Sequence, residues 1–371
     1  MPRRYLNGRN VKRRRTQQCA AAAETGPQRP PKFTIGLMHE LCEYCGALRF
    51  RRETRNCCHN GKVQLPPLSP YPEELNNLLC SGDEQSKNFQ DNIRQYNSAL
   101  SFASFGAQVV YPPGRGPYTF RLHGQIYHRT GSLHPGESEK PIYNQLYIIE
   151  GHQATEHRLR YPENHNCRRD TMNLLTDVIQ RNSPFAMAYE HMFEVEKAAV
   201  ESVIQNNSDP PNITMYFKQG RDQCRCNAPT HDEVAAVFVV DDGAPPVNRD
   251  IVVHPRNQPP RKISYMSANI DPMVYSVFFP RGDLGWQHNT PHNPLHSTPK
   301  RNTLILLQFY AHRLACRAQF NPLFYGGKLF QQYVVDAYVR TEAAHLDFVR
   351  RNQNNLSGFV SRTDRSHTNA V

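Results

Sequence analysis

Hydrophobic residues recur at helical spacing over three long stretches of the chain. An amphipathic helix is predicted over 86–105, with Gly106 as its stop and apolar or small residues on one face: Phe89, Ile93, Tyr96, Leu100 and Ala103. A two-part helix is predicted over 168–182 and 184–206, because Pro184 lacks the amide hydrogen that a continuous helix needs. The longest periodic stretch, 327–353, predicts one helix with a shared apolar face: Leu329, Tyr333, Val334, Ala337, Tyr338 and Leu346.

Other stretches are rich in aromatic and β-branched residues, which is typical of strands. The first two are 118–129 and 143–150, joined by a Gly-, Pro- and Ser-containing loop at 131–141. Further strands are predicted at four places: 213–218, 234–240, 250–253 and 260–266. Strands and helices come in blocks and do not alternate strictly. The pattern therefore indicates an α+β fold with a mainly antiparallel sheet, amphipathic helices and a long C-terminal helix.

Composition and charge narrow the class of partner. The 371 residues are enough for roughly two domains with a hydrophobic core. The net charge of +11 favours a polyanion, and nucleic acid is the first candidate. The sequence has no apolar run long enough for a membrane span and no signal-peptide core at its N-terminus. We therefore expect a soluble protein that is not secreted and has no membrane partner.

The N-terminal stretch is strongly basic and has no acidic residue before Glu24. Its composition predicts a disordered arm, because it cannot bury enough apolar surface to offset the entropy of ordering. We interpret the arm as a phosphate-contacting or nuclear-import segment, with a merely solubilising tail as the alternative. The predicted DNA contacts in it are Arg3, Arg4, Arg9, Lys12, Arg13, Arg14 and Arg15.

Four of the ten cysteines are clustered near the N-terminus. Cys42 and Cys45 form a Cys-x-x-Cys pair, and Cys57, Cys58 and His59 follow after a short spacer. Two such pairs suit a tetrahedral structural zinc site, and clustered cysteines in a reducing compartment are more often ligands than disulfides. Adjacent cysteines do not easily face one ion, so His59 competes with Cys57 or Cys58 for a position. The alternative is a set of buried thiols without a metal.

Basic side chains flank the cysteines and would offset the negative charge of thiolates; they are also predicted DNA contacts. They are Arg49, Arg51, Arg52, Arg55 and Lys62. His39 is a further candidate ligand for the zinc ion.

Catalytic patterns are missing from the sequence. It contains no His-x-His pair for a divalent ion and no Gly-x-x-x-x-Gly-Lys-Ser/Thr loop for ATP. His288, His292 and His296 are spaced by four, but the prolines between them break the helix that would bring them together, so a solvated linker is favoured over a metal site. The Cys-Arg-Cys at 224–226 is weak evidence for a metal without a second pair nearby. We expect no enzymatic activity and no ATP site on this chain.

Several long stretches carry a resemblance to one family. In chain order they are "CEYCGAL…CCHNGKVQLPPL", "NIRQYNSALSFASFGA", "YTFRLHGQIYHRTGSLHP" with "PIYNQLYI", "DPMVYSVFFPRGDLGW" and "LQFYAHRLACRAQFNPLFYGGKLFQQYVVDAYVRTEAAHLDFVRRNQNNL". Together they resemble the N-terminal part of Helitron transposon replicase/helicase proteins, over about residues 36–356.

In that family a zinc-finger-like N-terminal region precedes a rolling-circle nuclease of the HUH type and a superfamily 1 helicase. The resemblance implies that the cysteine module binds zinc and helps to recognise transposon DNA. The family's metal-binding histidines, catalytic tyrosine and ATP loop have no matching positions here, so none of those roles is carried over. The sequence departs from the family after "NQNNL", which predicts a truncated protein.

The resemblance and the composition together predict a domain organisation. It comprises a disordered basic arm (1–35), a cysteine module with a Pro-rich linker (36–72), an α+β Helitron N-terminal region (73–285), a linker (286–307), the start of the Helitron helicase-like domain (308–356) and an unstructured tail (357–371).

The function expected from these features is DNA binding, to transposon ends or single-stranded DNA, in the nucleus. One alternative is a piece of an active nuclease-helicase whose remainder is missing from the sequence. Another is a protein-interaction module that docks a partner on the helices at 168–206. The oligomeric state is left open.

Overall fold

A computed structural model describes most of the chain between residues 37 and 353. The described residues are 37–110, 121–130, 132–135, 140–141, 143–149, 151–206, 212–217, 235–240, 251–253, 261–296 and 302–353. The basic arm with its seven predicted DNA contacts, the cysteines at 224–226 and the tail at 357–371 lie outside them. Contacts divide the chain into two units, Met1–Glu40 with Arg49–Glu53, and Leu41–Leu48 with Thr54–Val371.

In the first unit the described residues are organised around one arginine. The Arg49 guanidinium lies 3.9 Å from the Glu40 carboxylate and donates a hydrogen bond of 2.7 Å to the backbone carbonyl of Glu53. The Glu53 side chain in turn accepts from the backbone N–H of Phe50 at 2.9 Å. These contacts close a short turn.

The second unit combines helices with antiparallel sheets, so the predicted α+β class is confirmed. Two short strands, β1 (Glu40–Leu41) and β2 (Leu48–Arg49), flank the first cysteine pair. The single helix predicted over 86–105 is wrong in detail. The structure has α3 (Glu84–Asp91) and α4 (Ile93–Leu100), and Gly106 lies in a strand.

Local capping explains this break. The Asp83 side chain accepts a hydrogen bond from Ser86 N–H and caps the start of α3, and Asn92 leaves helical geometry with φ −111° and ψ 20°. The apolar face survives the break, because Phe89, Ile93 and Tyr96 are all buried. The preceding helix α2 (Glu73–Cys80) was not predicted from the sequence.

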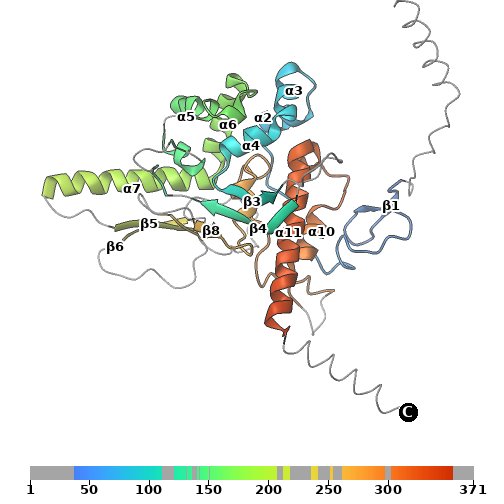
Figure 1. The fold of residues 1–371 in the computed structure, drawn as a ribbon. Coiled ribbons are helices and arrows are strands. Elements are labelled where there is room, and N and C mark those ends of the chain that lie inside the picture. Colours follow the sequence, from blue (N-terminus) through green and yellow to red (C-terminus); the bar gives the residue numbers. More distant parts are fainter. Residues whose placement is uncertain are drawn as a thin grey trace, which may run out of the picture. The chain divides into compact units, whose positions relative to one another are not determined.

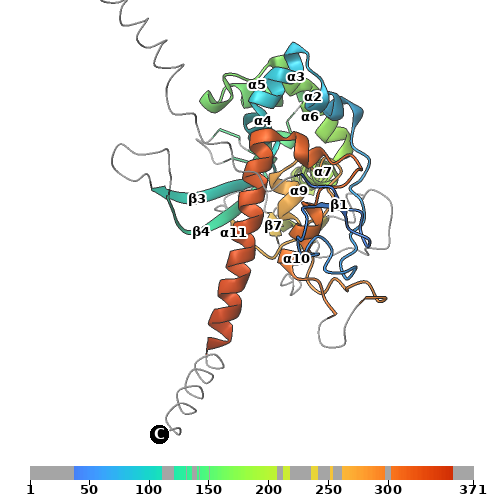
Figure 2. The same ribbon diagram turned by 90° about the vertical axis from the view of Figure 1, so that its right-hand side faces the viewer.

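One three-stranded antiparallel sheet has the order β3-β4-β8, with β3 (Ser104–Val110), β4 (Arg121–Thr130) and β8 (Arg261–Ile263). β3 and β4 lie side by side as a long hairpin (Figure 2). Their register shifts between Gly106 and Gln108, as at a β-bulge. The prediction of β4 is confirmed, and β8 is shorter than predicted.

The strand predicted at 143–150 is wrong. The structure has a 3-10 helix, η1 (Tyr143–Tyr147), followed by α5 (Gly151–Leu159) and η2 (Pro162–Asn164). Two side chains tie this region to the end of α4. The Tyr147 hydroxyl donates to the Leu100 carbonyl, and the fully buried Arg158 donates to the Ala99 carbonyl at 2.9 Å.

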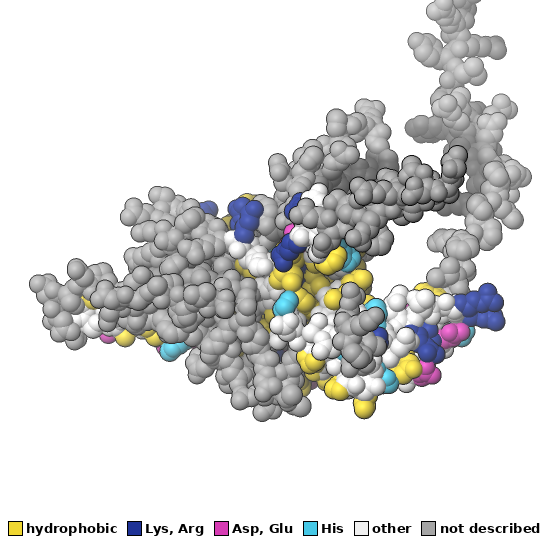
Figure 3. Space-filling model, turned by 90° about the horizontal axis from the view of Figure 1, so that it is seen from below, with side chains coloured by type: hydrophobic (Ala, Val, Ile, Leu, Met, Phe, Trp, Pro, Cys, Tyr) yellow, Lys and Arg dark blue, Asp and Glu magenta, His cyan; other side chains and the backbone are white. Residues whose placement is uncertain are grey.

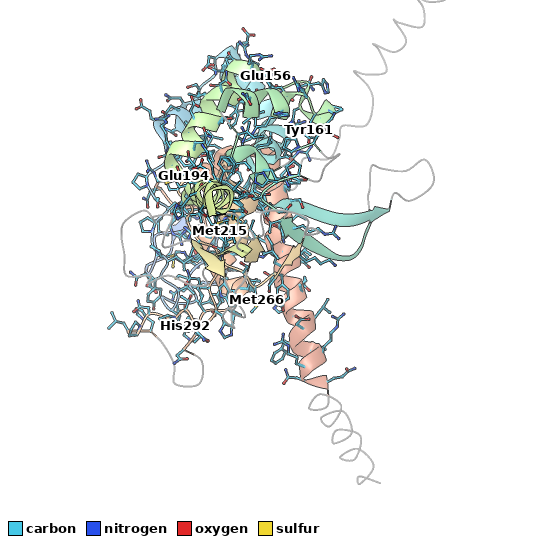
Figure 4. The ribbon with its side chains drawn as sticks, turned by 90° about the vertical axis from the view of Figure 1, so that its left-hand side faces the viewer. Glu156, Tyr161, Glu194, Met215, Met266 and His292 are labelled. Carbon is cyan, nitrogen blue, oxygen red and sulfur yellow. The ribbon has the colours of Figure 1, made fainter. Side chains whose placement is uncertain are left out.

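The two-part helix is confirmed as α6 (Arg169–Asn182) and α7 (Pro184–Asn206). A second antiparallel sheet has the order β6-β5-β7, with β5 (Asn212–Phe217), β6 (Ala235–Val240) and β7 (Ile251–Val253). Figure 4 shows Met215 of β5 next to α7, which is viewed along its axis. Phe217 packs on Tyr189 of α7, with ring centroids 5.8 Å apart.

The remaining helices are α9 (Ile270–Val274), α10 (Leu306–Arg313), η3 (Pro322–Tyr325) and α11 (Gly327–Arg351). α11 lies beside α10 and passes β4 (Figure 1). Its buried face agrees with the predicted apolar one at Leu329, Tyr333 and Ala337 only. Val334, Tyr338 and Leu346 are exposed, whereas the charged Asp336 and Arg340 are buried.

These buried charges belong to a polar network in the main core. Arg340 Nη1 donates to Asp271 Oδ1 at 2.6 Å, and Tyr333 OH donates to Asp271 Oδ2 at 3.1 Å. Asp336 Oδ2 lies 3.1 Å from His128 Nε2 of β4 and accepts from Tyr275 at 3.2 Å. Helical periodicity predicts an apolar face wherever the core is apolar, and here the core is partly polar.

In the segment predicted as a linker, 286–307, the described residues 286–296 and 302–307 include side chains that are more closely packed than the polar, proline-rich sequence indicates. Trp286 is 4% exposed and donates from its indole N–H to the Leu304 carbonyl at 2.8 Å. His292, one of the three spaced histidines, is 4% exposed and lies 3.0 Å from the Gln308 side-chain oxygen. Specific hydrogen bonds to residues further along the chain make this polar segment part of the fold.

Candidate metal centre and its neighbouring hollows

The first cysteine pair lies on a tight turn between β1 and β2. The backbone N–H of Gly46 donates to the Cys42 carbonyl, and the N–H of Cys42 donates to the Ala47 carbonyl, both at 2.8 Å. Gly46 has φ +65°, a conformation that glycine adopts without steric cost. The turn brings the side chains of Cys42 and Cys45 to one side.

The second pair opens a left-handed turn. His59, Asn60 and Gly61 have φ of 49°, 58° and 80°, and the chain then closes with Val63 N–H donating to the Cys58 carbonyl at 3.0 Å. The N–H of Gly61 also points at Cys58 Sγ, 3.3 Å away. A backbone donor of this kind stabilises a thiolate.

All four sulfur atoms converge. The distance from Cys42 Sγ to Cys58 Sγ is 3.6 Å, and that from Cys45 Sγ to Cys57 Sγ is 3.7 Å. A tetrahedral zinc ion with Zn–S bonds of about 2.3 Å requires S···S separations of about 3.8 Å. All four atoms lie within 4.8 Å of one another, so any remaining pair has to close by no more than about 1 Å. The donor set and its geometry fit a structural zinc ion.

The thiols influence one another's ionisation. Burial by itself raises the pKa of Cys42, but hydrogen bonds from the backbone N–H groups of Tyr44 and Cys45, and from the neighbouring thiols, lower it to about 7. Burial, together with hydrogen bonds to Cys42 and Cys45, raises the pKa of Cys57. Burial likewise raises the pKa of Cys58 to about 12. The protein alone therefore favours the thiolate at Cys42 over those at Cys57 and Cys58, which a bound cation would stabilise.

The structure places His59, one of the two histidine candidates, outside this group. His59 faces a polar pocket, and burial followed by the charges of His292 and Lys62 lowers its pKa. His39 is exposed, and its Nδ1 lies 2.8 Å from the Leu37 carbonyl. Cys57 and Cys58 both join the group, so adjacent cysteines do face one point here. The expectation that His59 replaces one of them finds no support in the geometry.

The predicted basic contacts near the module are mostly exposed. Arg51, Arg52 and Arg55 are exposed and Lys62 is partly so, whereas Arg49 is engaged by Glu40 and Glu53. Arg55 forms an ion pair of 2.9 Å with Glu43 and also lies over the Tyr44 ring, 5.7 Å from its centroid.

Two hollows adjoin the module. The larger, here called the aromatic groove, has a volume of about 730 Å³ and is lined by Tyr44 and Gly61 of the module and by residues from 63–71 and 312–322. The smaller, here called the polar pocket, has a volume of about 310 Å³ and is lined by Thr54, Arg55, Asn56, His59, Asn60, Lys62, His292 and Gln308. On the face shown in Figure 3, hydrophobic side chains are interspersed with histidines and basic side chains.

Sequence reasoning missed the residues that the fold adds to these hollows. They are Tyr44, His292, Arg313, Arg317 and Phe320. Four of them are more than two hundred residues away from the cysteines, so neither periodicity nor motif spacing could associate them. Among the residues that the structure describes, no helix is long and apolar enough to cross a membrane.

Comparison with known families gives one match. Residues 309–370 match the model of the Helitron helicase-like domain at the N-terminus. This match relates the chain to Helitron helicases. It covers α10 from residue 309 onward, η3 and α11, together with residues beyond them. No curated protein matches the sequence. The family match implies a relationship to transposable elements and an interaction with nucleic acid.

Proposed function

We propose that this chain is a DNA-binding, N-terminal part of a Helitron-type transposon protein, acting in the nucleus. The single observation that carries the proposal is the group of four sulfur atoms within 4.8 Å of one another, in a chain whose C-terminal segment matches a Helitron domain. The module would hold a structural zinc ion, which keeps the turn at 57–63 in the shape that presents its basic residues. We assign a binding role to this chain and a catalytic role to none of its residues.

The zinc ion would be held by Cys42, Cys45, Cys57 and Cys58. Zinc bound to four thiolates stabilises the fold and leaves no open coordination position for chemistry. The protein's own contribution is the pair of turns that aim the thiols and the N–H of Gly61 that donates to Cys58 Sγ at 3.3 Å.

Charge supports nucleic acid as the partner. The chain has a net charge of +11, and exposed arginines at 51, 52 and 55 lie between the two cysteine pairs in the sequence. Phosphate contacts made by such residues release counterions, so affinity should fall steeply as salt rises.

The test uses the full chain with zinc bound. Zinc content is measured by atomic spectroscopy, and DNA affinity by fluorescence anisotropy over a series of salt concentrations. We expect about one zinc ion per chain and an affinity that weakens by more than tenfold between about 50 and 200 mM salt. A chain without zinc after reconstitution, or an affinity independent of salt, would contradict the proposal.

A further inference from the structure

The aromatic groove exposes rings that a folded protein usually buries. Phe320 is 44% exposed and Tyr44 is 43% exposed, and both line the groove. Phe320 is held from behind by Tyr325, with ring centroids 5.1 Å apart at an angle of 33°. A partly exposed ring that packs against a second ring can stack with a flat, apolar group of a ligand.

The same groove carries fixed positive charge. Arg317 is clamped to the backbone, with Nε donating to the Cys45 carbonyl at 3.1 Å and Nη1 to the His312 carbonyl at 2.8 Å. Arg313 also lines the groove, and among the described lining residues none is acidic. Burial is the main cause that lowers the pKa of His312 to about 3, and the positive charges of Arg317 and Arg313 lower it further. A ligand that combines a flat ring with negative charge matches both features.

Amide side chains complete the lining. Gln319 and Asn321 flank Phe320 along the chain, and Gln64 accepts from the Asn293 amide at 3.3 Å on another part of the groove. Side-chain amides offer both donors and acceptors, which are the groups that the edges of nucleobases recognise.

The polar pocket lies next to the groove along one turn of the chain. His59 and Lys62 line the pocket, while Gly61, between them, lines the groove. A Cβ atom at Gly61 would come within 2.8 Å of the His296 ring and 2.9 Å of the Tyr44 ring, so the turn fits against the groove only with glycine. None of the described residues lining the pocket is acidic, and Arg55 and Lys62 can both donate to an anion.

We propose that the aromatic groove accepts an unpaired base of single-stranded DNA, stacked on Phe320, while the adjacent polar pocket holds a phosphate of the same strand. The proposal rests on the proposed function, because it names the form of DNA that the chain prefers. A base in a duplex is stacked on its neighbours and cannot also stack on Phe320, so the groove selects strands whose bases are free.

The test measures the affinity of the zinc-loaded full chain for three DNA probes of equal length. They are an oligothymidine strand, an abasic strand with the same phosphates, and a duplex. We expect the thymidine strand to bind at least about 5-fold more tightly than the abasic strand, since stacking of one base on an aromatic ring contributes that much or more. Phe320→Ala should abolish this preference and leave the affinity for the abasic strand nearly unchanged. Phe320→Tyr, which keeps a ring, should retain the preference.

Phe348→Ala is the matched control, because Phe348 is an exposed phenylalanine, 65% accessible, at the far end of α11 and outside the groove. It should behave as the unmodified chain. If the unmodified chain binds the thymidine and abasic strands equally, the groove does not bind a base, although DNA binding through phosphates could still hold. Equal losses in Phe320→Ala and Phe348→Ala would also contradict base binding in the groove. Failure to bind any of the three probes rejects the proposed function itself.

Discussion

The cysteine module and the polar network under α11 both place polar groups inside the protein, but different forces hold them. Around the thiols, the buried apolar cluster consists of only Cys42, Ala47 and Cys58. The network around Arg340 lies within the large main core, and its charge is matched by Asp271, 2.6 Å away. Arg340 finds its counter-charge within the chain, whereas four thiolates would need a cation to hold them together.

This difference predicts that the structure of the cysteine module, and not that of the main core, depends on a bound metal ion. A cluster of three small side chains buries too little apolar area to order its loops, so the module's shape should depend on zinc. The helices and sheets of the main core should keep their structure when zinc is removed. The following predictions test this contrast, beginning with the largest effect.

The largest effect is expected from Cys58→Ser. Losing one of four thiolate ligands removes most of the metal affinity, because a structural zinc site needs all four. We expect the variant to lose its zinc during dialysis and the module to become protease-sensitive near residue 57, while the main thermal transition shifts little. Cys80→Ser, which alters an exposed thiol outside the module, is the control and should retain zinc. If Cys58→Ser retains zinc, Cys58 is not a zinc ligand.

The next effect is on the polar network. Asp271→Ala leaves the guanidinium of Arg340 buried without its partner, and we expect a loss of about 3–5 kcal/mol in the free energy of unfolding. The double variant Asp271→Leu with Arg340→Met removes both charges and should recover much of that loss. Urea denaturation measures both. A loss below about 1 kcal/mol for the single variant would show that water reaches Arg340.

A smaller effect is expected from pH acting through His312. Its pKa is lowered in the folded protein to about 3, and the unfolded value is near 6.5. The unfolded chain therefore binds one more proton between these values, and stability falls as pH decreases from about 6.5 toward 3. In His312→Gln, the free energy of unfolding, measured by urea denaturation at a series of pH values, should decrease less between about pH 6.5 and 3. His345→Gln, at an exposed position on α11, should show the same decrease in stability as the unmodified chain. If the unmodified chain and both variants lose stability equally at acidic pH, the burial of His312 would be contradicted.

The smallest effect concerns Lys62 of the polar pocket. Lys62→Gln removes one phosphate contact, so the slope of log affinity against log salt should become shallower by about 1. Lys328→Gln, at an exposed lysine outside the two hollows, provides the comparison and should keep the original slope. An unchanged slope in the Lys62 variant would show that the DNA phosphates do not contact Lys62 in the polar pocket.

Several features were predictable because they are local. The cysteine pairs, the break at Pro184 and the antiparallel α+β class follow from spacing and composition. The strand predicted at 143–150 is instead a 3-10 helix over Tyr143–Tyr147, and the Tyr147 hydroxyl donates a tertiary hydrogen bond to the Leu100 carbonyl, which sequence composition does not reveal. The helix predicted over 86–105 failed because the cap at Asp83 and the bend at Asn92 set its limits.

The sequence by itself determined the two cysteine pairs and several of the helices and strands, since each depends on residues near one another in the chain. Only the tertiary structure decided that Cys57 and Cys58 both join the thiol group, that His292 is buried, and that α11 faces the core with Arg340 and Asp336. It also decided the aromatic groove, which joins Tyr44 to Phe320 across most of the chain. Such partners meet by packing between distant segments, as Arg340 meets Asp271 across 69 positions, and the periodicity of one segment contains no information about the other.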